Sequence, residues 1–150
     1  MGTLLTALTA LMLFVTPVGA AEELVLEYLC SDMKGSYMGA PQWTVETDNS
    51  KDQKVLLAYI GEGNPASVFW IKDGEAYYER NGVGFSMGSG FLIIIVAQDR
   101  TESYVFNAGT MELYFNQVRS GNNMLPNTLK GFRGTCAPAG VTLRKFFKQN

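Results

Sequence analysis

The segment ESYVFNAGTMELYFNQV, residues 102–118, alternates apolar and polar residues on both sides of an Ala-Gly pair. A period of two is typical of antiparallel strands that bury one face. A two-residue loop at the Ala-Gly pair would place Phe106 opposite Met111 and Tyr104 opposite Leu113, which gathers four apolar side chains on one face. The segment therefore predicts a β-hairpin.

A second hairpin is expected in residues 67–80, which contain an Asp-Gly turn. Regular pairing around this turn would set Trp70 opposite Tyr77 and Lys72 opposite Glu75 on one face. Because Trp and Tyr bury a large area at little entropic cost, this face is a candidate binding surface. The alternative is that both faces of the hairpin are covered and the two rings belong to the core.

Further strands are expected at residues 24–31, 42–47, 55–60, 91–98 and 141–147. The run FLIIIV, residues 91–96, is apolar on both faces and predicts a mid-sheet strand covered on each side. A short helical turn is expected over residues 125–132, with a proline early and a glycine late. Together these patterns predict an all-β protein, an antiparallel meander of about eight strands that forms a small barrel or a sandwich.

The composition fits one globular domain, with 47% hydrophobic and 17% charged residues in a chain of 150. Twelve Lys and Arg residues against 14 Asp and Glu give a net charge of −2. No field that would attract a phosphate backbone is expected from this balance, so nucleic acid is not an expected partner. The oligomeric state is left open.

Residues 1–20 are apolar and uncharged and end in the small residues Val18, Gly19 and Ala20. This pattern predicts a signal peptide that is cleaved before a single β-rich domain, residues 21–150. The apolar run is too short to span a bilayer, so no membrane span is expected after cleavage. An uncleaved anchor and N-myristoylation at Gly2 are the alternatives.

Only two cysteines are present, Cys30 and Cys136. In an oxidising compartment such a pair predicts one disulfide, and two buried free thiols are the alternative. The expected location is therefore periplasmic or secreted.

Three motifs are typical of catalytic or ligand loops but lack the required context. Residues 84–88 read GFSMG, the pattern of a nucleophile elbow, yet the chain has no histidine and an apolar strand follows. In residues 61–66 a G-x-G-x-x-A pattern leads into a strand, where a dinucleotide site needs a helix. Residues 48–52 have calcium-loop spacing, but Gln53 stands where a glycine is needed. We expect no metal and no cofactor.

Acid and base chemistry by carboxylates alone would need two acids facing each other. The candidate acids Glu75, Glu79, Asp99 and Glu112 are scattered among strand ends and polar positions, which is typical of surface charge. No catalytic residue is assigned, and we expect a protein that is not an enzyme.

Two stretches resemble known groups of proteins. Residues 69–76, FWIKDGEA, are similar to a strand turn of small periplasmic inhibitors of c-type lysozyme, which are exported, β-rich and disulfide-bearing. Residues 119–136 resemble the C-termini of small exported bacterial β-rich proteins of unassigned function. The first likeness implies inhibition of an exoenzyme, and the second implies residence in the cell envelope without naming a chemistry.

The sequence thus favours an exported, non-enzymatic binding or interaction module of the bacterial cell envelope. Its partner would be a protein or small ligand of the envelope. The alternatives are an inhibitor of an exoenzyme such as lysozyme and a carboxylate-dependent glycan hydrolase.

Overall fold

The computed structural model describes residues 21–146, apart from 43, 51, 62 and 122–126. The expected signal peptide, residues 1–20, lies outside this part. Nine β-strands and no helix occur among the described residues. The described segments thus contain no helix that could span a lipid bilayer. The strands are β1 (Ala21–Gly39), β2 (Val45–Ser50), β3 (Gln53–Tyr59), β4 (Pro65–Lys72), β5 (Glu75–Met87), β6 (Gly90–Val96), β7 (Arg100–Asn107), β8 (Glu112–Arg119) and β9 (Thr128–Phe146).

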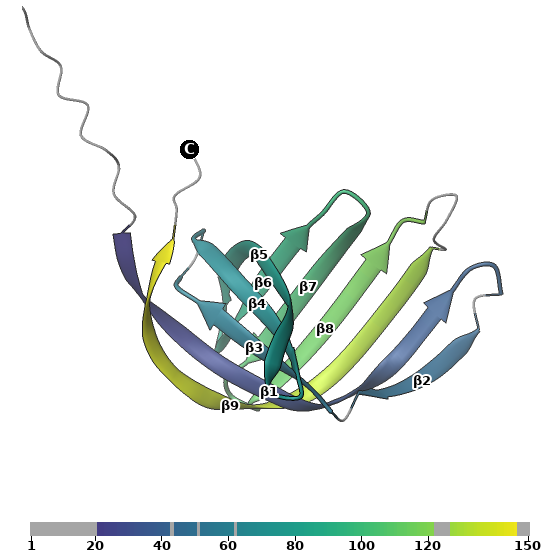
Figure 1. Cartoon of the computed structure of the whole chain (residues 1–150), viewed down its shortest axis with the longest axis horizontal. Helices are drawn as coiled ribbons and strands as arrows, with labels where there is room; N and C mark the ends of the chain where they lie inside the picture. Colours follow the sequence, from purple (N-terminus) through teal and green to yellow (C-terminus); the bar gives the residue numbers. More distant parts are fainter. Residues whose placement is uncertain (1–20, 43, 51, 62, 122–126, 147–150) are drawn as a thin grey trace, which may run out of the picture.

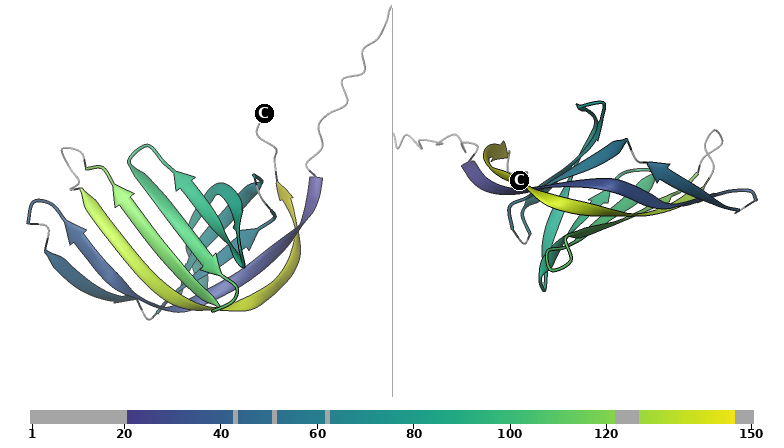
Figure 2. Two further views of the ribbon diagram at one scale, coloured as in Figure 1. Left: turned by 180° about the vertical axis from the view of Figure 1, so that it is seen from behind. Right: turned by 90° about the horizontal axis from the view of Figure 1, so that it is seen from below.

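The strands form one antiparallel sheet that closes on itself (Figures 1 and 2). From β3 to β9 each strand pairs with the next along the chain, and β9 returns to pair with β1. The long strand β1 pairs with β3 through residues 26–30 and with β2 through residues 33–38. The expected all-β meander is confirmed: it is an eight-stranded barrel with β2 as an additional edge strand.

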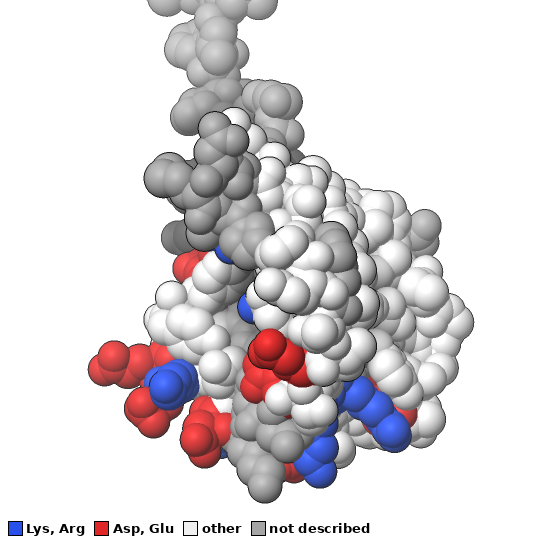
Figure 3. All heavy atoms as spheres, turned by 90° about the vertical axis from the view of Figure 1, so that its right-hand side faces the viewer, with Lys and Arg blue, Asp and Glu red and all other residues white. Residues whose placement is uncertain are grey.

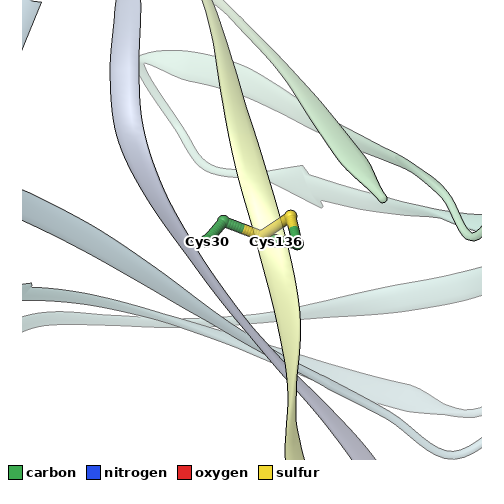
Figure 4. The surroundings of a disulfide bond; sticks show 2 residues. All are labelled: Cys30 and Cys136. Carbon is green, nitrogen blue, oxygen red and sulfur yellow. A yellow bond between two sulfur atoms is a disulfide. The ribbon is translucent and has the colours of Figure 1, made fainter. Parts of the chain in front are cut away.

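The closing seam between β1 and β9 is the longest pairing in the sheet. It runs from Ala21 opposite Phe146 to Gly39 opposite Thr128, with irregularities in β1 after Glu27 and Ser31. Cys30 lies directly opposite Cys136 within this seam, and their Sγ atoms form a disulfide (Figure 4). The covalent bond therefore joins the first and last strands of the barrel near the middle of their contact.

Aromatic rings dominate the barrel interior. Tyr59 stacks on Phe91 with ring centroids 4.3 Å apart, and Phe91 contacts Phe106 at 5.0 Å. Toward the other end, Trp70 packs edge-on against Phe115 at 5.3 Å. Such tilted and stacked pairs contribute stability beyond the area that they bury. The inward side chains of seven strands thus meet in one continuous core.

The apolar run in β6 is only partly as expected. It lies mid-sheet between β5 and β7, and Phe91, Ile93 and Ile95 are buried inside the barrel. The expectation that both faces are covered is wrong, because Val96 is 76% exposed on the alternate face and the described residues contain no helical layer outside the barrel. A closed barrel offers one interior, so the outer face of its strands meets solvent.

The hairpin of residues 102–118 exists, but its expected register is wrong by two residues. Phe106 pairs with Leu113, and Tyr104 pairs with Phe115. The loop is longer because the Asn107 side chain accepts hydrogen bonds from the backbone N–H groups of residues 109 and 110, at 2.8 and 3.2 Å. Such an Asx turn competes with a two-residue hairpin loop. A shift of two keeps the same side chains on the buried face.

The expectation of a short helical turn over residues 125–132 is also wrong for the part that the structure describes. Residues 128–132 belong to β9, where Phe132 is buried and pairs with Phe115, while 125 and 126 lie outside the described residues. Pairing with β8 and β1 on both sides holds this segment extended, so the proline and glycine signals for a helical turn are overridden.

The glycines of residues 84–88 have two different structural roles. Gly88 has φ = 53°, a conformation that favours glycine, and lies in the β5–β6 turn. Gly84 lies within β5, where a Cβ atom would be 2.5 Å from the Tyr59 ring. That ring cannot retreat easily, because it stacks on Phe91 and its hydroxyl is 2.9 Å from the Ser86 Oγ.

Replacing Cys30 and Cys136 together with alanine should lower the free energy of unfolding. The disulfide closes a sequence separation of 106 residues, for which chain entropy gives up to about 4 to 5 kcal/mol. Urea denaturation of the oxidised protein and of the double variant measures the difference. Reduction of the native protein should give the same midpoint as the double variant, and equal midpoints for oxidised and reduced protein would refute the expectation.

Gly84→Ala should destabilise the barrel by about 1 to 3 kcal/mol, the usual cost of overpacking a core. Gly131→Ala is the matched control in β9, because its nearest neighbour would be the Asn116 Oδ1 at an ordinary 3.4 Å. Urea denaturation of both variants should show a lower midpoint for Gly84→Ala only. A Gly84 variant as stable as the Gly131 variant would show that the Tyr59 ring yields freely.

Candidate functional site at the barrel mouth

A cavity of about 310 Å³ opens at one end of the barrel. This volume is at the lower end of the roughly 300 to 1,000 Å³ that is usual for small-ligand sites. Its walls come from seven strands, so closure of the barrel creates it. The residues that line it are Asp48, Gln53, Trp70, Tyr77, Tyr78, Arg100, Glu102, Phe115, Gln117, Arg119, Lys130 and Phe132.

Trp70, Phe115 and Phe132 form the aromatic part of the lining that is continuous with the core. Trp70 is only 8% exposed, and its indole N–H donates to the Tyr104 hydroxyl at 3.0 Å. This hydrogen bond fixes the orientation of the indole ring. The cavity therefore includes an aromatic wall in which the orientation of Trp70 is fixed.

Glu102 is the central polar group of the site, with 1% of its surface exposed. Its Oε1 accepts from the Tyr78 hydroxyl at 2.8 Å and from the Gln117 Nε2 at 2.8 Å, and its Oε2 accepts from the Tyr104 hydroxyl at 2.9 Å. The Arg100 Nε lies 3.2 Å from Oε1. A buried carboxylate is tolerated only with such partners, and these contacts lock four lining or core side chains around one acceptor.

The two phenols that donate to Glu102 are held in their protonated form. Burial, and then the charge of Glu102, raise the pKa of Tyr104 far above its usual range. Burial and the hydrogen bond to Glu102 also raise the pKa of Tyr78. Both effects disfavour a phenolate next to a carboxylate. The hydroxyl groups therefore remain hydrogen-bond donors at neutral pH.

The cations at the mouth differ in their partners. Arg119 donates to the Asp99 Oδ2 at 3.0 Å, and Arg100 lies between Asp99 at 3.6 Å and Glu102 at 3.2 Å. Lys130 is different, because its ammonium group lies 5.7 Å from the Tyr37 ring centroid and forms no ion pair with any residue that the structure describes. Lys130 is thus the lining cation that forms no ion pair with a described residue, and Asp48 is an acid of the same lining.

The Asp73-Gly74 turn forms as expected, with φ values of 53° and 84° and with Lys72 opposite Glu75. The expected pairing of Trp70 with Tyr77 is wrong. A bulge shifts the register between Trp70 and Ile71, so Trp70 pairs with Tyr78.

The candidate surface is therefore divided between two environments. Trp70 is buried, Tyr77 is 55% exposed, and both line the mouth cavity. Lys72 and Glu75 are exposed at the hairpin tip and are not among the lining residues.

Sequence reasoning missed Glu102, although a signal was present. Glu102, Tyr104 and Phe106 occupy alternate positions of β7, so their side chains point to the same face of the strand, and this face was expected to be buried for the two aromatic residues. A glutamate in register with two core aromatics points into the core and requires partners.

The acids that were singled out from the sequence lie elsewhere. Glu75 and Glu79 are exposed on β5, and Asp99 pairs with Arg119. Glu112 pairs with Arg133 on the outer face, and this ion pair lowers the pKa of Glu112. None of these four carboxylates lines the mouth cavity.

No group of three His, Cys, Asp or Glu side chains in the described ranges could hold a metal ion. On the face shown in Figure 3, acidic and basic side chains lie together near the lower edge, and much of the remainder is uncharged. Charges of mixed sign do not produce an extended field of one sign on this face. The expectation that nucleic acid is not a partner stays a prediction.

Comparison with known proteins adds no assignment: no family model, no curated protein and no solved structure matches the chain. The resemblances to lysozyme inhibitors and to exported β-rich proteins stay predictions. The disulfide is compatible with a periplasmic or extracellular location.

Glu102→Gln should destabilise the protein by on the order of 3 kcal/mol, because it leaves Arg100 without its most buried counter-charge. Glu75→Gln, at the exposed hairpin tip, is the control and should change stability by less than about 0.5 kcal/mol. Urea denaturation measures both. The Trp70 indole N–H signal in NMR should shift in Glu102→Gln, since Tyr104 links the two side chains. A Glu102 variant that matches the control in stability would contradict this role.

Proposed function

We propose that this protein is an exported, non-enzymatic binding protein that holds a small ligand of the bacterial cell envelope in the mouth cavity of its barrel. One observation carries the proposal: an open cavity of ligand size is lined by polar groups that a buried carboxylate holds in place. Concave sites with an apolar floor and a few oriented polar groups are typical of small-molecule binding.

Preorganisation supports binding at this cavity. Tyr78 and Gln117 both line the cavity and both donate to Glu102, so their rotamers are set without a ligand. The Arg80 guanidinium lies 4.2 Å from the Tyr78 ring centroid and covers that ring as well. Side chains that are already ordered lose little conformational entropy when a ligand binds, which increases affinity.

The contacts of Glu102 favour binding over hydrolysis. A carboxylate-dependent hydrolase needs one carboxyl group to exchange a proton with the substrate and a second at about 5 to 10 Å. Both oxygens of Glu102 already accept hydrogen bonds from protein donors, and the group is 1% exposed. Glu102 is therefore suited to orienting its neighbours.

Export is supported by the disulfide in the barrel seam and by the signal-like residues 1–20. A binding protein outside the cytoplasm would retain the Cys30–Cys136 bond, which stabilises a chain of small size. The location that we propose is the periplasm or the extracellular space of a bacterium.

NMR with a mixture of small sugars, amino acids and carboxylates tests the proposal. A bound probe should shift the Trp70 indole N–H signal and the amide signals of cavity residues such as Gln117 and Lys130. Tyr77→Ala should then weaken binding about fivefold or more, since removing one partly buried ring contact costs roughly 1 kcal/mol.

Tyr114→Ala is the matched control, because Tyr114 is an exposed tyrosine on β8 that does not line the cavity. It should leave affinity unchanged. Probe-induced shifts confined to the outer surface, or equal effects of the two tyrosine variants, would overturn the proposal.

A further inference from the structure

The polar lining of the mouth cavity offers both donors and acceptors. Gln53 carries an amide that can donate and accept. The Gln117 Nε2 donates to Glu102, so its amide oxygen is the group left to accept from a ligand. Arg119 adds guanidinium donors beside Asp99. A ligand that satisfies these groups must itself donate and accept at several positions, as the hydroxyl groups of a sugar do.

The aromatic lining suits the other property of a sugar ring. Tyr77 lies at the cavity with 55% of its surface exposed, and the Trp70 indole in the same lining is oriented by Tyr104. The C–H faces of a pyranose are apolar and can pack against such rings while the hydroxyl groups point to the polar wall. A purely apolar chain in the same place would leave the Gln117 amide oxygen and the Gln53 amide without a ligand partner, at a cost of about 1 to 3 kcal/mol each where they lose contact with water.

Lys130 places a positive charge in the cavity lining that a bound anion can pair with. Arg100 and Arg119 are paired with Glu102 and Asp99, whereas Lys130 contacts the Tyr37 ring and has no acidic partner among the described residues. An anionic group on a bound ring would give this ammonium a counter-charge. A carboxylate is a compact group that accepts a charge-assisted hydrogen bond from a lysine.

We infer that the mouth cavity binds an acidic monosaccharide, with its ring against Tyr77 and Trp70 and its carboxylate at Lys130. The inference rests on the proposed function and narrows it to one ligand class. The cavity volume of about 310 Å³ suits a single ring better than an oligosaccharide, because it lies at the small end of ligand sites.

Calorimetric titration of the purified protein with glucuronate, glucose and benzoate tests each part of this inference. Glucose keeps the hydroxylated ring without the carboxylate, and benzoate keeps a carboxylate on a ring without hydroxyl groups. Glucuronate should bind about tenfold more tightly than glucose, as expected for one added charge-assisted hydrogen bond. It should also bind more tightly than benzoate.

Lys130→Met should remove the preference for glucuronate over glucose, measured as the ratio of the two dissociation constants in the same variant. Lys72→Met, at the exposed hairpin tip outside the cavity, is the control and should keep the preference. Urea denaturation of both variants checks that they remain folded.

Three results would overturn the inference while leaving a small-ligand site intact, provided that NMR shifts still map to the cavity. These are benzoate binding at least as tightly as glucuronate, equal affinity for glucuronate and glucose, and an unchanged preference in Lys130→Met. If none of the three compounds binds but another probe shifts the cavity signals, the ligand class is wrong and the binding function stands. If no probe shifts these signals, both fail.

Discussion

Return of β9 to β1 is the constraint on which the rest of the structure depends. The seam joins the two ends of the described chain, and every other pairing from β3 to β9 is between neighbours in sequence. Local hairpins form without large loss of chain entropy, but closing the seam requires the ends of the meander to meet. The Cys30–Cys136 bond acts at this contact. A disulfide that closes a long loop removes more conformational entropy from the unfolded chain than one that closes a short loop. The Cys30–Cys136 bond therefore reinforces the pairing of β1 with β9, which sequence proximity does not favour.

Closure also explains why the interior divides into an aromatic part and a polar part. An eight-stranded barrel has room for side chains and little more. Stacked rings such as Tyr59 and Phe91 fill one region, while Glu102 and its donors stand where the barrel opens. Burying a carboxylate is unfavourable unless its oxygens are satisfied, and here the donors come from β5, β7 and β8. The network therefore connects three strands at the mouth and keeps the cavity walls in a defined arrangement.

The features that could be predicted from the sequence are mainly those determined by residues close together in the chain. Period-two alternation indicated the strands, the Asp-Gly pair indicated its turn, and two cysteines in an export context indicated a disulfide. The register of the Phe106 hairpin was wrong because a side-chain amide, Asn107, lengthened the loop. Barrel closure could not be distinguished from a sandwich, because both bury the same alternating faces. The cavity was not foreseen for a related reason: Trp70, Glu102 and Lys130 lie on β4, β7 and β9, and only closure brings them together.

The bulge in β5 shows how an irregularity produces the site. In a regular strand, Tyr77 and Tyr78 would point to opposite faces, and one of them would leave the cavity. The register shift between Trp70 and Ile71 sets Tyr78 opposite Trp70, directs the Tyr78 hydroxyl to Glu102 and leaves Tyr77 in the cavity lining. Bulges re-aim side chains and increase strand twist near functional sites. Two consecutive tyrosines therefore have different roles: Tyr78 belongs to the network that holds the wall, and Tyr77 lies on the surface where we propose that a ligand binds. Strands are predicted from the regular alternation of apolar and polar residues. A bulge interrupts this alternation, so a site that depends on a bulge is not predicted from the sequence pattern.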